Sequence, residues 1–212
     1  MICRREAASS RYFGWMVRAR RAQDWERDLA NARVAEAELA SILATDSRLD
    51  DFVDNSDAVD RLDFSFTFGG ARVDIDLKEK RQRYSPGIGQ LWPELAPQDL
   101  FVVDETVYRR VVWQGGGGYL VVHDHPEERW AIFGPWELTL GPRRRYQRWG
   151  QRRGESFLKG KILLDLTAAA RVSRTFKVDD LLWVILRSSE ARDAVEAVAT
   201  GGEDIPELGD AQ

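Results

Sequence analysis

Two stretches in the first half of the chain alternate between apolar and polar residues. They cover residues 62–68 and 71–78, and only Gly69 and Gly70 separate them. Alternation with a period of two is typical of a strand with one buried face, and paired glycines suit the positive φ angles of a tight hairpin turn. The pattern therefore predicts a β-hairpin with one apolar face and one polar face.

The rest of the chain predicts helices and strands in mixed order. Residues 22–44 are strong helix formers without Gly or Pro and predict a long helix. Residues 46–60 predict an acidic, turn-rich connection that holds a short strand or helical turn near Phe52, and residues 85–97 predict a loop. Further elements are expected as strands at 100–103, 119–123, 130–133, 136–140 and 162–166, helices at 106–113, 178–188 and 191–199, and an arginine-rich loop before the last strand. This order predicts an α/β fold with a mixed β-sheet flanked by helices.

Composition narrows the class of protein. With 212 residues, 43% hydrophobic and 31% charged, the chain can bury a core, which excludes general disorder and favours one domain over residues 22–200. No apolar run approaches the roughly 18 residues that cross a bilayer, so no membrane partner is expected. The single cysteine, Cys3, excludes an internal disulfide and a cysteine-based zinc site. A reducing, cytoplasmic setting is the simplest interpretation.

The net charge of −4 conceals blocks of opposite sign. Residues 1–21 form a basic arm with six arginines and one acid, although Met16 is an alternative start of the natural chain. Residues 46–63 hold seven aspartates, residues 141–161 hold eight basic residues and one acid, and residues 201–212 form an acidic tail. Because local field guides binding more than total charge, the chain is compatible with a polyanionic partner.

The register of the hairpin brings two acids together. A two-residue turn pairs Phe68 with Ala71, and counting back along both strands places Asp63 opposite Asp76. Opposed like charges destabilise a sheet, and carboxylate oxygens are the ligands that Mg²⁺ or Mn²⁺ prefers, so this pair predicts a metal site. Lys78 shares the polar face and can reach a bound water or a phosphate. The apolar face is predicted to contain Phe64, Phe66, Phe68, Val73, Ile75 and Leu77.

This arrangement resembles the PD-(D/E)XK, or restriction-endonuclease-like, nuclease superfamily. Its signature is an acid on one strand and an acid-x-Lys triplet on the next, preceded by a helix that carries a glutamate; here the triplet is Asp76-Leu77-Lys78 and the earlier acid is Asp63. Leu62 stands where a proline often precedes the first acid. The resemblance spans about residues 23–123 and implies a metal-dependent endodeoxyribonuclease. Asp63 and Asp76 would hold Mg²⁺ or Mn²⁺, and Lys78 would orient or deprotonate a water or stabilise charge on the phosphate.

The helical glutamate is chosen by its phase. At 3.6 residues per turn the apolar residues of the predicted helix share one face. Glu36 lies at the edge of this apolar stripe and Glu38 lies well off it, toward solvent. A metal-facing acid belongs at the edge of the face that packs on the sheet, so Glu36 is predicted as the fourth catalytic residue, with Glu38 as second choice. The apolar stripe consists of Leu29, Ala32, Leu39, Ile42 and Leu43.

Two basic clusters predict contacts with DNA. Arginine forks match phosphate oxygens, and aromatic rings stack on unpaired bases. An acidic partner protein, or the chain's own acidic tail, is an alternative ligand for these charges. The first cluster, next to the triplet, is Lys80, Arg81 and Arg83. The second is Arg143, Arg144, Arg145, Tyr146, Arg148, Trp149, Arg152 and Arg153.

Three interpretations of function compete. The first is a metal-dependent nuclease in DNA defence, repair or recombination, with DNA or RNA and any strandedness left open. The second is a catalytically inactive nuclease-like fold that serves as a DNA-binding or scaffolding subunit of a larger complex. The third is an unrelated α/β protein. The oligomeric state is left open under all three interpretations. His123 and His125 are interpreted as a turn at a strand end, with a metal pair as the alternative.

Overall fold

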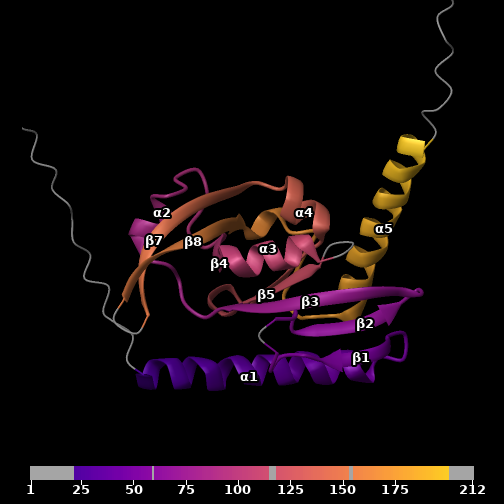
Figure 1. Cartoon of the computed structure of the whole chain (residues 1–212), viewed down its shortest axis with the longest axis horizontal. Helices are drawn as coiled ribbons and strands as arrows, with labels where there is room; N and C mark the ends of the chain where they lie inside the picture. Colours follow the sequence, from indigo (N-terminus) through magenta and orange to yellow (C-terminus); the bar gives the residue numbers. More distant parts are fainter. Residues whose placement is uncertain (1–21, 59, 115–117, 153–154, 201–212) are drawn as a thin grey trace, which may run out of the picture.

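A computed structural model describes residues 22–58, 60–114, 118–152 and 155–200 (Figure 1). The basic arm 1–21, the acidic tail 201–212 and Arg153 lie outside the described residues. As predicted, the protein is α/β with a mixed sheet flanked by helices, and a second, smaller sheet is added. Of the described helices, none combines the length and the hydrophobicity needed to cross a membrane.

The larger sheet holds six strands in the order β1-β2-β3-β5-β6-β9. The first three form an antiparallel meander, β5 runs parallel to β3, and β6 and β9 continue the sheet antiparallel. The parallel step from β3 to β5 requires a crossover connection, and this connection contains α3. The strand bounds are β1 Asp50–Asp54, β2 Phe64–Phe68, β3 Ala71–Lys80, β5 Tyr119–Asp124, β6 Arg129–Phe133 and β9 Arg171–Ser173.

Helices and the smaller sheet cover the two faces of the larger sheet. The long helices α1 (Ala22–Thr45) and α5 (Val178–Thr200) contribute to one core, on one face of the sheet. The short helices α3 (Glu105–Trp113) and α4 (Pro135–Leu140) lie on the other face, with the antiparallel sheet β4-β8-β7 beyond them (Figure 1). The remaining elements are β4 Leu100–Asp104, β7 Arg143–Arg152, β8 Glu155–Asp165, α2 Pro86–Gly89, η1 His125–Glu127 and η2 Leu166–Ala168.

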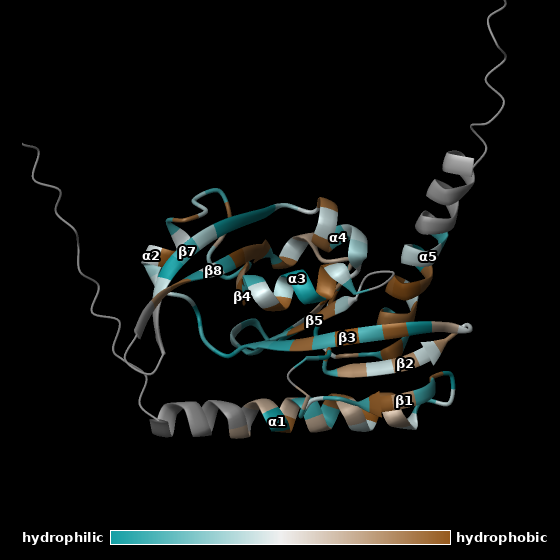
Figure 2. Ribbon diagram, in the orientation of Figure 1, coloured by the Kyte–Doolittle hydropathy of each residue, from teal (hydrophilic) through white to brown (hydrophobic). Residues whose placement is uncertain are grey.

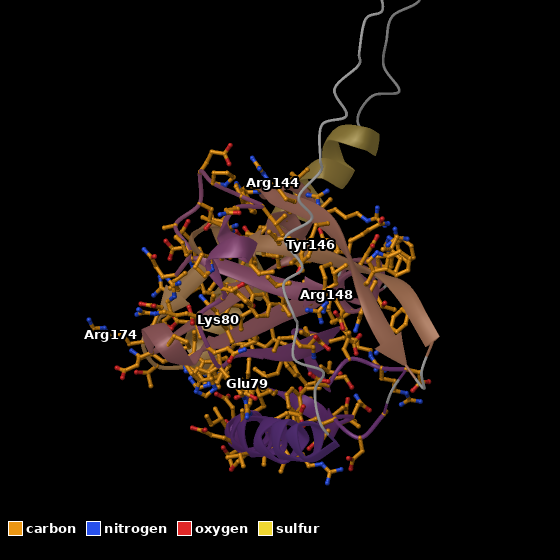
Figure 3. The ribbon with its side chains drawn as sticks, turned by 90° about the vertical axis from the view of Figure 1, so that its left-hand side faces the viewer. Glu79, Lys80, Arg144, Tyr146, Arg148 and Arg174 are labelled. Atoms are coloured by element: carbon orange, nitrogen blue, oxygen red, sulfur yellow. The ribbon has the colours of Figure 1, made fainter. Side chains whose placement is uncertain are left out.

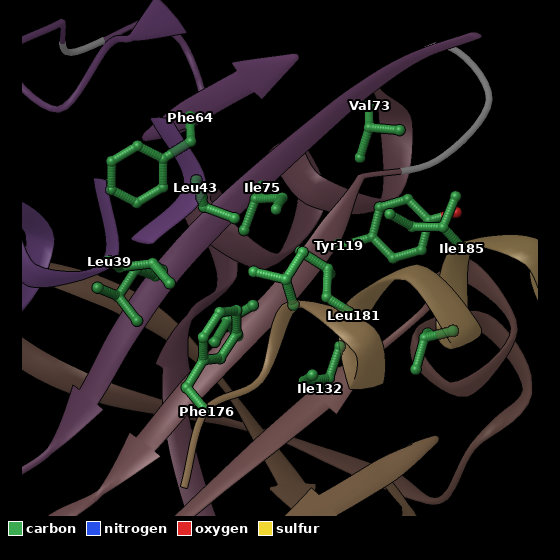
Figure 4. Packing of buried hydrophobic residues seen from close by; sticks show 14 of the residues in the cluster. Leu39, Leu43, Phe64, Val73, Ile75, Tyr119, Ile132, Phe176, Leu181 and Ile185 are labelled. Carbon is green, nitrogen blue, oxygen red and sulfur yellow. The ribbon is translucent and has the colours of Figure 1, made fainter. Parts of the chain in front are cut away.

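The core between α1, α5 and the sheet fixes the β2–β3 hairpin in place (Figure 4). Leu39 and Leu43 of α1 are fully buried against Phe64 and Ile75 of the hairpin, while α5 contributes Leu181. Each such side chain stabilises the fold by about 1.5–3 kcal/mol when it leaves water. Since the apolar face of the hairpin is anchored here, its polar face points the other way, toward α3.

The hairpin matches the predicted pattern. Gly69 and Gly70 both have positive φ angles, 60° and 78°, and Phe68 pairs with Ala71 across the turn. Polar and apolar residues alternate along β3 (Figure 2). The predicted apolar face is confirmed, because Phe64, Phe66, Val73, Ile75 and Leu77 are buried in the core and Phe68 packs against it.

Two predicted elements are wrong. Residues 136–140 were expected as a strand because Trp136, Leu138 and Leu140 alternate with polar residues, but they form α4. Pro135 opens this helix, and the Glu137 side chain accepts the backbone N–H of Gly134 at 3.1 Å, which caps its first turn.

The arginine-rich segment, expected as a loop, is the ten-residue strand β7, paired with β8 along its whole length. The pairing with β8 is not contained in the pattern of the segment itself, so that pattern does not reveal it. β8 is also longer than the predicted strand 162–166, and the two expected C-terminal helices form the single helix α5.

Candidate functional site

Asp63, Asp76 and Lys78 form one cluster, which we call the carboxylate cluster. Asp63 lies just before β2, beside β3, and its Oδ2 accepts the backbone N–H of Leu77 at 2.8 Å. Lys78 Nζ lies 3.3 Å from Asp63 Oδ2 and 2.8 Å from Asp76 Oδ2. A single cation therefore contacts both carboxylates, as the hairpin register led us to expect.

Negative charge exceeds positive charge in this cluster. Two carboxylates share one ammonium group, and the Asp76 side chain is only 4% exposed while that of Lys78 is 30% exposed. Asp76 Oδ2 lies 2.8 Å from Lys78 Nζ and has no further polar partner among the described residues. Because Asp63 shares the same ammonium group, the two carboxylates favour an additional cation.

The pKa values report the same imbalance. Burial raises the pKa of Asp76 to about 6; the positive charge of Lys78 opposes this shift and the negative charge of Asp63 adds to it. Burial by itself lowers the pKa of Lys78, but the charges of Asp76 and Asp63 outweigh it and the pKa is raised. Lys78 is therefore an ammonium ion at neutral pH.

The phase argument for the helical acid is consistent with the structure. Glu36 is half-buried on α1, whereas Glu38 is exposed. Burial raises the pKa of Glu36, and the negative charge of Asp63 raises it further, while Lys78 lowers it. Asp54 and Glu79 raise it as well, and no hydrogen bond or ion pair among the described residues joins Glu36 to the carboxylate cluster, so its catalytic role stays a prediction.

One charged neighbour of the cluster was not predicted. Arg110 of α3 lowers the pKa of Asp76 through its positive charge, and its Nη1 donates to the backbone carbonyl of Arg61 at 3.2 Å. It thereby holds the segment that leads to Asp63 against α3. The signal available in the sequence was the predicted helix 106–113, but nothing in that pattern indicated which strand the helix covers.

The structure corrects the role predicted for Lys80. Its side chain is completely buried, its Nζ lies 3.2 Å from Asp124 Oδ2, and it also donates to the carbonyl of Gln98. Arg129 contacts the same Asp124 oxygen at 2.9 Å and pairs with Asp99 at 2.8 Å. We call these four charged residues the buried network. Lys80 shares the face of Asp76 and Lys78, and that face is covered here, so Lys80 has no surface to offer to DNA.

The other two residues of the first basic cluster have partners at the surface. Arg81 forms an ion pair with Glu79. Arg83 pairs with Glu127 at 3.0 Å and its side chain is 72% exposed. The Arg83 pair is exposed and contributes little to stability, whereas the Glu79 side chain of the other pair is only 9% exposed.

The arginines of β7 divide between the two faces of the strand. Arg145 pairs with Glu105 of α3 at 2.9 Å, and on the same face Arg143 donates to backbone carbonyls of the α4 end. On the opposite face Arg144 pairs with Glu94 at 2.8 Å and lies over the ring of Trp92. One nucleic acid cannot contact both faces at once.

The face of β7 with Arg144, Tyr146 and Arg148, the arginine row, lies on the side of the molecule where β3 ends. Figure 3 shows this row above Lys80 and Glu79. Among the described residues none forms an ion pair with Arg148, and Tyr146 is half-buried. Trp149 is 74% exposed. The Arg152 side chain, like Arg153, lies outside what the structure describes.

Comparison of the chain with protein-family models, curated proteins and solved structures finds no match. The function is therefore argued from the geometry of these residues.

Proposed function

We propose that this protein is a metal-dependent nuclease with a restriction-endonuclease-like core, which hydrolyses phosphodiester bonds of DNA at the carboxylate cluster. The observation that carries the proposal is the contact of one ammonium group with two carboxylates, one of them buried. The order of elements supports it, since α1 precedes the β1-β2-β3 meander and α3 leads to β5 parallel to β3.

The donor atoms of the cluster suit a hard divalent ion. Asp63 and Asp76 offer carboxylate oxygens only, without nitrogen or sulfur ligands, which favours Mg²⁺ or Mn²⁺. Asp63 and Asp76 would hold the ion, and Glu36 would add negative charge from α1. Bound there, Mg²⁺ supplies Lewis-acid polarisation of the phosphate and lowers the pKa of a bound water.

The chain's own residues have separate tasks. Lys78 is charged and 30% exposed, so its Nζ can donate to a phosphate oxygen or orient a water molecule. Its raised pKa argues against a role as general base and for stabilisation of the negative charge that grows on the phosphate. Asp63 fixes the strand next to it through the Leu77 N–H bond, which keeps the triplet in place.

The arginine row offers the surface for the nucleic-acid backbone. Arg148 can take a phosphate without breaking an ion pair to any described residue, while Arg144 must leave Glu94 to do so. The exposed ring of Trp149 is suited to stacking on an unpaired base. Figure 3 shows Arg144, Tyr146 and Arg148 of β7 on the same side of the molecule as Lys80, near the end of β3.

A second candidate is a catalytically inactive subunit with the same fold that binds DNA or scaffolds a complex. It is favoured by one observation: Lys78 already contacts both acids, which is also how a purely structural cluster would neutralise itself. The two candidates differ in the requirement for metal, because only the nuclease needs an added cation.

The test is cleavage of supercoiled, linear duplex, branched and single-stranded DNA, and of RNA, by the wild type and by Lys78→Ala in Mg²⁺ or Mn²⁺. We expect metal-dependent cleavage by the wild type and a loss of about 10²- to 10⁴-fold in Lys78→Ala. Lys177→Ala, which removes an exposed lysine just before α5, is the matched control and should keep its rate. Binding without cleavage of any substrate would favour the inactive subunit.

A further inference from the structure

A second group of ligand atoms lies on the opposite face of β3 from the carboxylate cluster. Glu79, His123 and His125 each place one ligand atom within 4.8 Å of the others. Glu79 and His123 are directly paired across β3 and β5, and both occupy odd positions, which face α1 and α5. His125 follows in η1, with its ring centroid 3.9 Å from that of His123. We call these three residues the histidine cluster.

One buried ring nitrogen of this cluster has no hydrogen-bond partner among the described residues. His125 Nε2 lies 2.6 Å from Glu79 Oε1, a hydrogen bond that holds both groups in place. His123 stacks on Trp130 at 4.0 Å with an interplanar angle of 8°, and its buried Nδ1 has no hydrogen-bond partner among the described residues. A buried polar atom of this kind costs about 1–3 kcal/mol, so the surroundings of His123 are not fully satisfied by the described residues.

Both protonation and orientation suit coordination by these groups. Burial, aided by the charge of His125, lowers the pKa of His123 to about 4, so its imidazole is neutral and carries a free lone pair at neutral pH. Arg81 holds the other carboxylate oxygen of Glu79, so Oε1 stays turned toward the histidines. Charged partners behind a ligand are what orient it in metal sites.

We propose that Glu79, His123 and His125 bind a borderline transition-metal ion such as Zn²⁺, at a site separate from the Mg²⁺ site of the proposed nuclease. Two imidazoles and one carboxylate match the three-ligand zinc sites that keep a fourth position for water, whereas Mg²⁺ avoids imidazole. The ion takes the place of the hydrogen bond between His125 Nε2 and Glu79 Oε1, and a neutral imidazole then carries its single N–H on Nδ1. The His125 side chain is 40% exposed, which gives the ion a path from solvent.

The inference does not depend on nuclease activity, so it is tested by binding alone. The probes are Zn²⁺, followed by titration calorimetry, and Co²⁺, followed by visible d–d absorption, on untagged full-length chain. The sequence contains two histidines and one cysteine, Cys3, so the possible nitrogen and sulfur ligands are few. We expect one tight equivalent and a Co²⁺ spectrum of low coordination number.

Variants separate the two metal sites. His125→Ala and Glu79→Gln should each weaken Zn²⁺ and Co²⁺ binding by at least about tenfold, whereas Asp76→Asn should leave it unchanged. His125 is partly exposed, so its loss leaves the core intact, and unchanged unfolding of the metal-free variant checks this. Equal Zn²⁺ affinity in His125→Ala and wild type, or loss of Zn²⁺ in Asp76→Asn alone, would overturn the proposal.

Discussion

Two ionic clusters follow each other along the same face of β3, and their charge balance differs. The buried network has two positive and two negative groups, with Lys80 and Asp124 fully buried and Arg129 and Asp99 nearly so. The carboxylate cluster next to it has two negative groups and one positive group. Each cluster contains one buried carboxylate oxygen without a hydrogen bond, so burial alone does not separate them.

The different charge balance indicates that the buried network stabilises the fold, whereas the carboxylate cluster serves function. The buried network joins β3, β5 and β6 of the larger sheet to the segment that enters β4, and every charge in it has an opposite neighbour. Balanced charges of this kind hold a structure together. The carboxylate cluster beside it has two carboxylates and one partly exposed ammonium group, and Arg110 of α3 acts on Asp76 only through its field, without an ion pair among the described residues. Unbalanced charge of this kind is typical of a functional site.

The largest expected effect is the loss of cleavage in Asp76→Asn. Removing one charge from the unbalanced cluster removes a metal ligand and should lower the cleavage rate about 10³-fold or more. Asp74→Asn is the matched control, since Asp74 lies on the same face of β3 but pairs with Arg72 at 3.1 Å. Plasmid nicking in Mg²⁺ measures both rates. Equal rates in the two variants would remove the distinction between these acids.

The buried network should instead respond in stability. Lys80→Met keeps the aliphatic stem but removes the charge, so Asp124 keeps only Arg129, and unfolding should become easier by about 3–5 kcal/mol. Urea denaturation measures the change. Arg83→Ala, which breaks an exposed ion pair with Glu127, should cost less than about 1 kcal/mol. A small loss in Lys80→Met would mean that the two clusters do not differ as described.

The pH dependence of stability sharpens the comparison further. The pKa of Asp76 rises from 3.8 to about 6 on folding, so the folded state holds the extra proton between these values and loses stability as the pH rises through this window. The total loss is about 3 kcal/mol at 1.36 kcal/mol per pKa unit. In metal-free buffer Asp76→Asn should therefore be more stable than wild type at pH 8 by up to this amount, and equally stable below pH 4.

The same window contains an opposite contribution from His123. Its pKa falls from 6.5 to about 4 on folding, so it stabilises the protein above this window and the stability is lost as the pH falls through it. The two contributions offset each other in the wild type. The difference between wild type and Asp76→Asn, measured by urea denaturation at each pH, isolates the aspartate. A difference that does not grow with pH would contradict the raised pKa.

The smallest expected effect concerns the arginine row. Replacing Arg148 by Ala should reduce the slope of log affinity against log salt by about 0.9 for duplex DNA, or about 0.7 for single strands. Arg145→Ala, whose partner Glu105 already neutralises it, should change the slope less. Fluorescence anisotropy at several salt concentrations measures both slopes. Equal changes of slope in the two variants would contradict the assignment of nucleic-acid binding to the arginine row.

The hairpin could be predicted because local rules determine it. Alternation, the glycine pair and the two-residue turn fix which residues face each other, and from this follow the apolar face and the meeting of Asp63 with Asp76. The choice of Glu36 over Glu38 follows from helical phase in the same way. Each of these inferences uses residues close in sequence.

The wrong sequence-based predictions concern residues whose structure depends on partners that are distant in sequence. The arginine-rich composition of the β7 segment predicts a loop. Pairing with β8 makes it a strand. The sequence predicts Lys80 as a surface charge. In the structure its Nζ contacts Asp124 of β5 and the Gln98 carbonyl, and both partners are distant in sequence. The effect of Arg110 on Asp76 depends on how α3 packs over the sheet, which the sequence pattern does not indicate. Long-range pairing and helix packing supply this information, and the residues alone do not carry it.

The most direct test of the central claim is the effect of Mg²⁺ on thermal unfolding at pH 8, in a His125→Ala background that removes the second proposed site. If the carboxylate cluster binds the ion, Mg²⁺ at about ten times its dissociation constant should stabilise the protein by about 1.4 kcal/mol and raise Tm by about 3–6 °C. The gain should persist in Asp74→Asn and vanish in Asp76→Asn, which is already more stable without metal. An equal rise of Tm in Asp76→Asn, or no rise in any variant, would contradict the account.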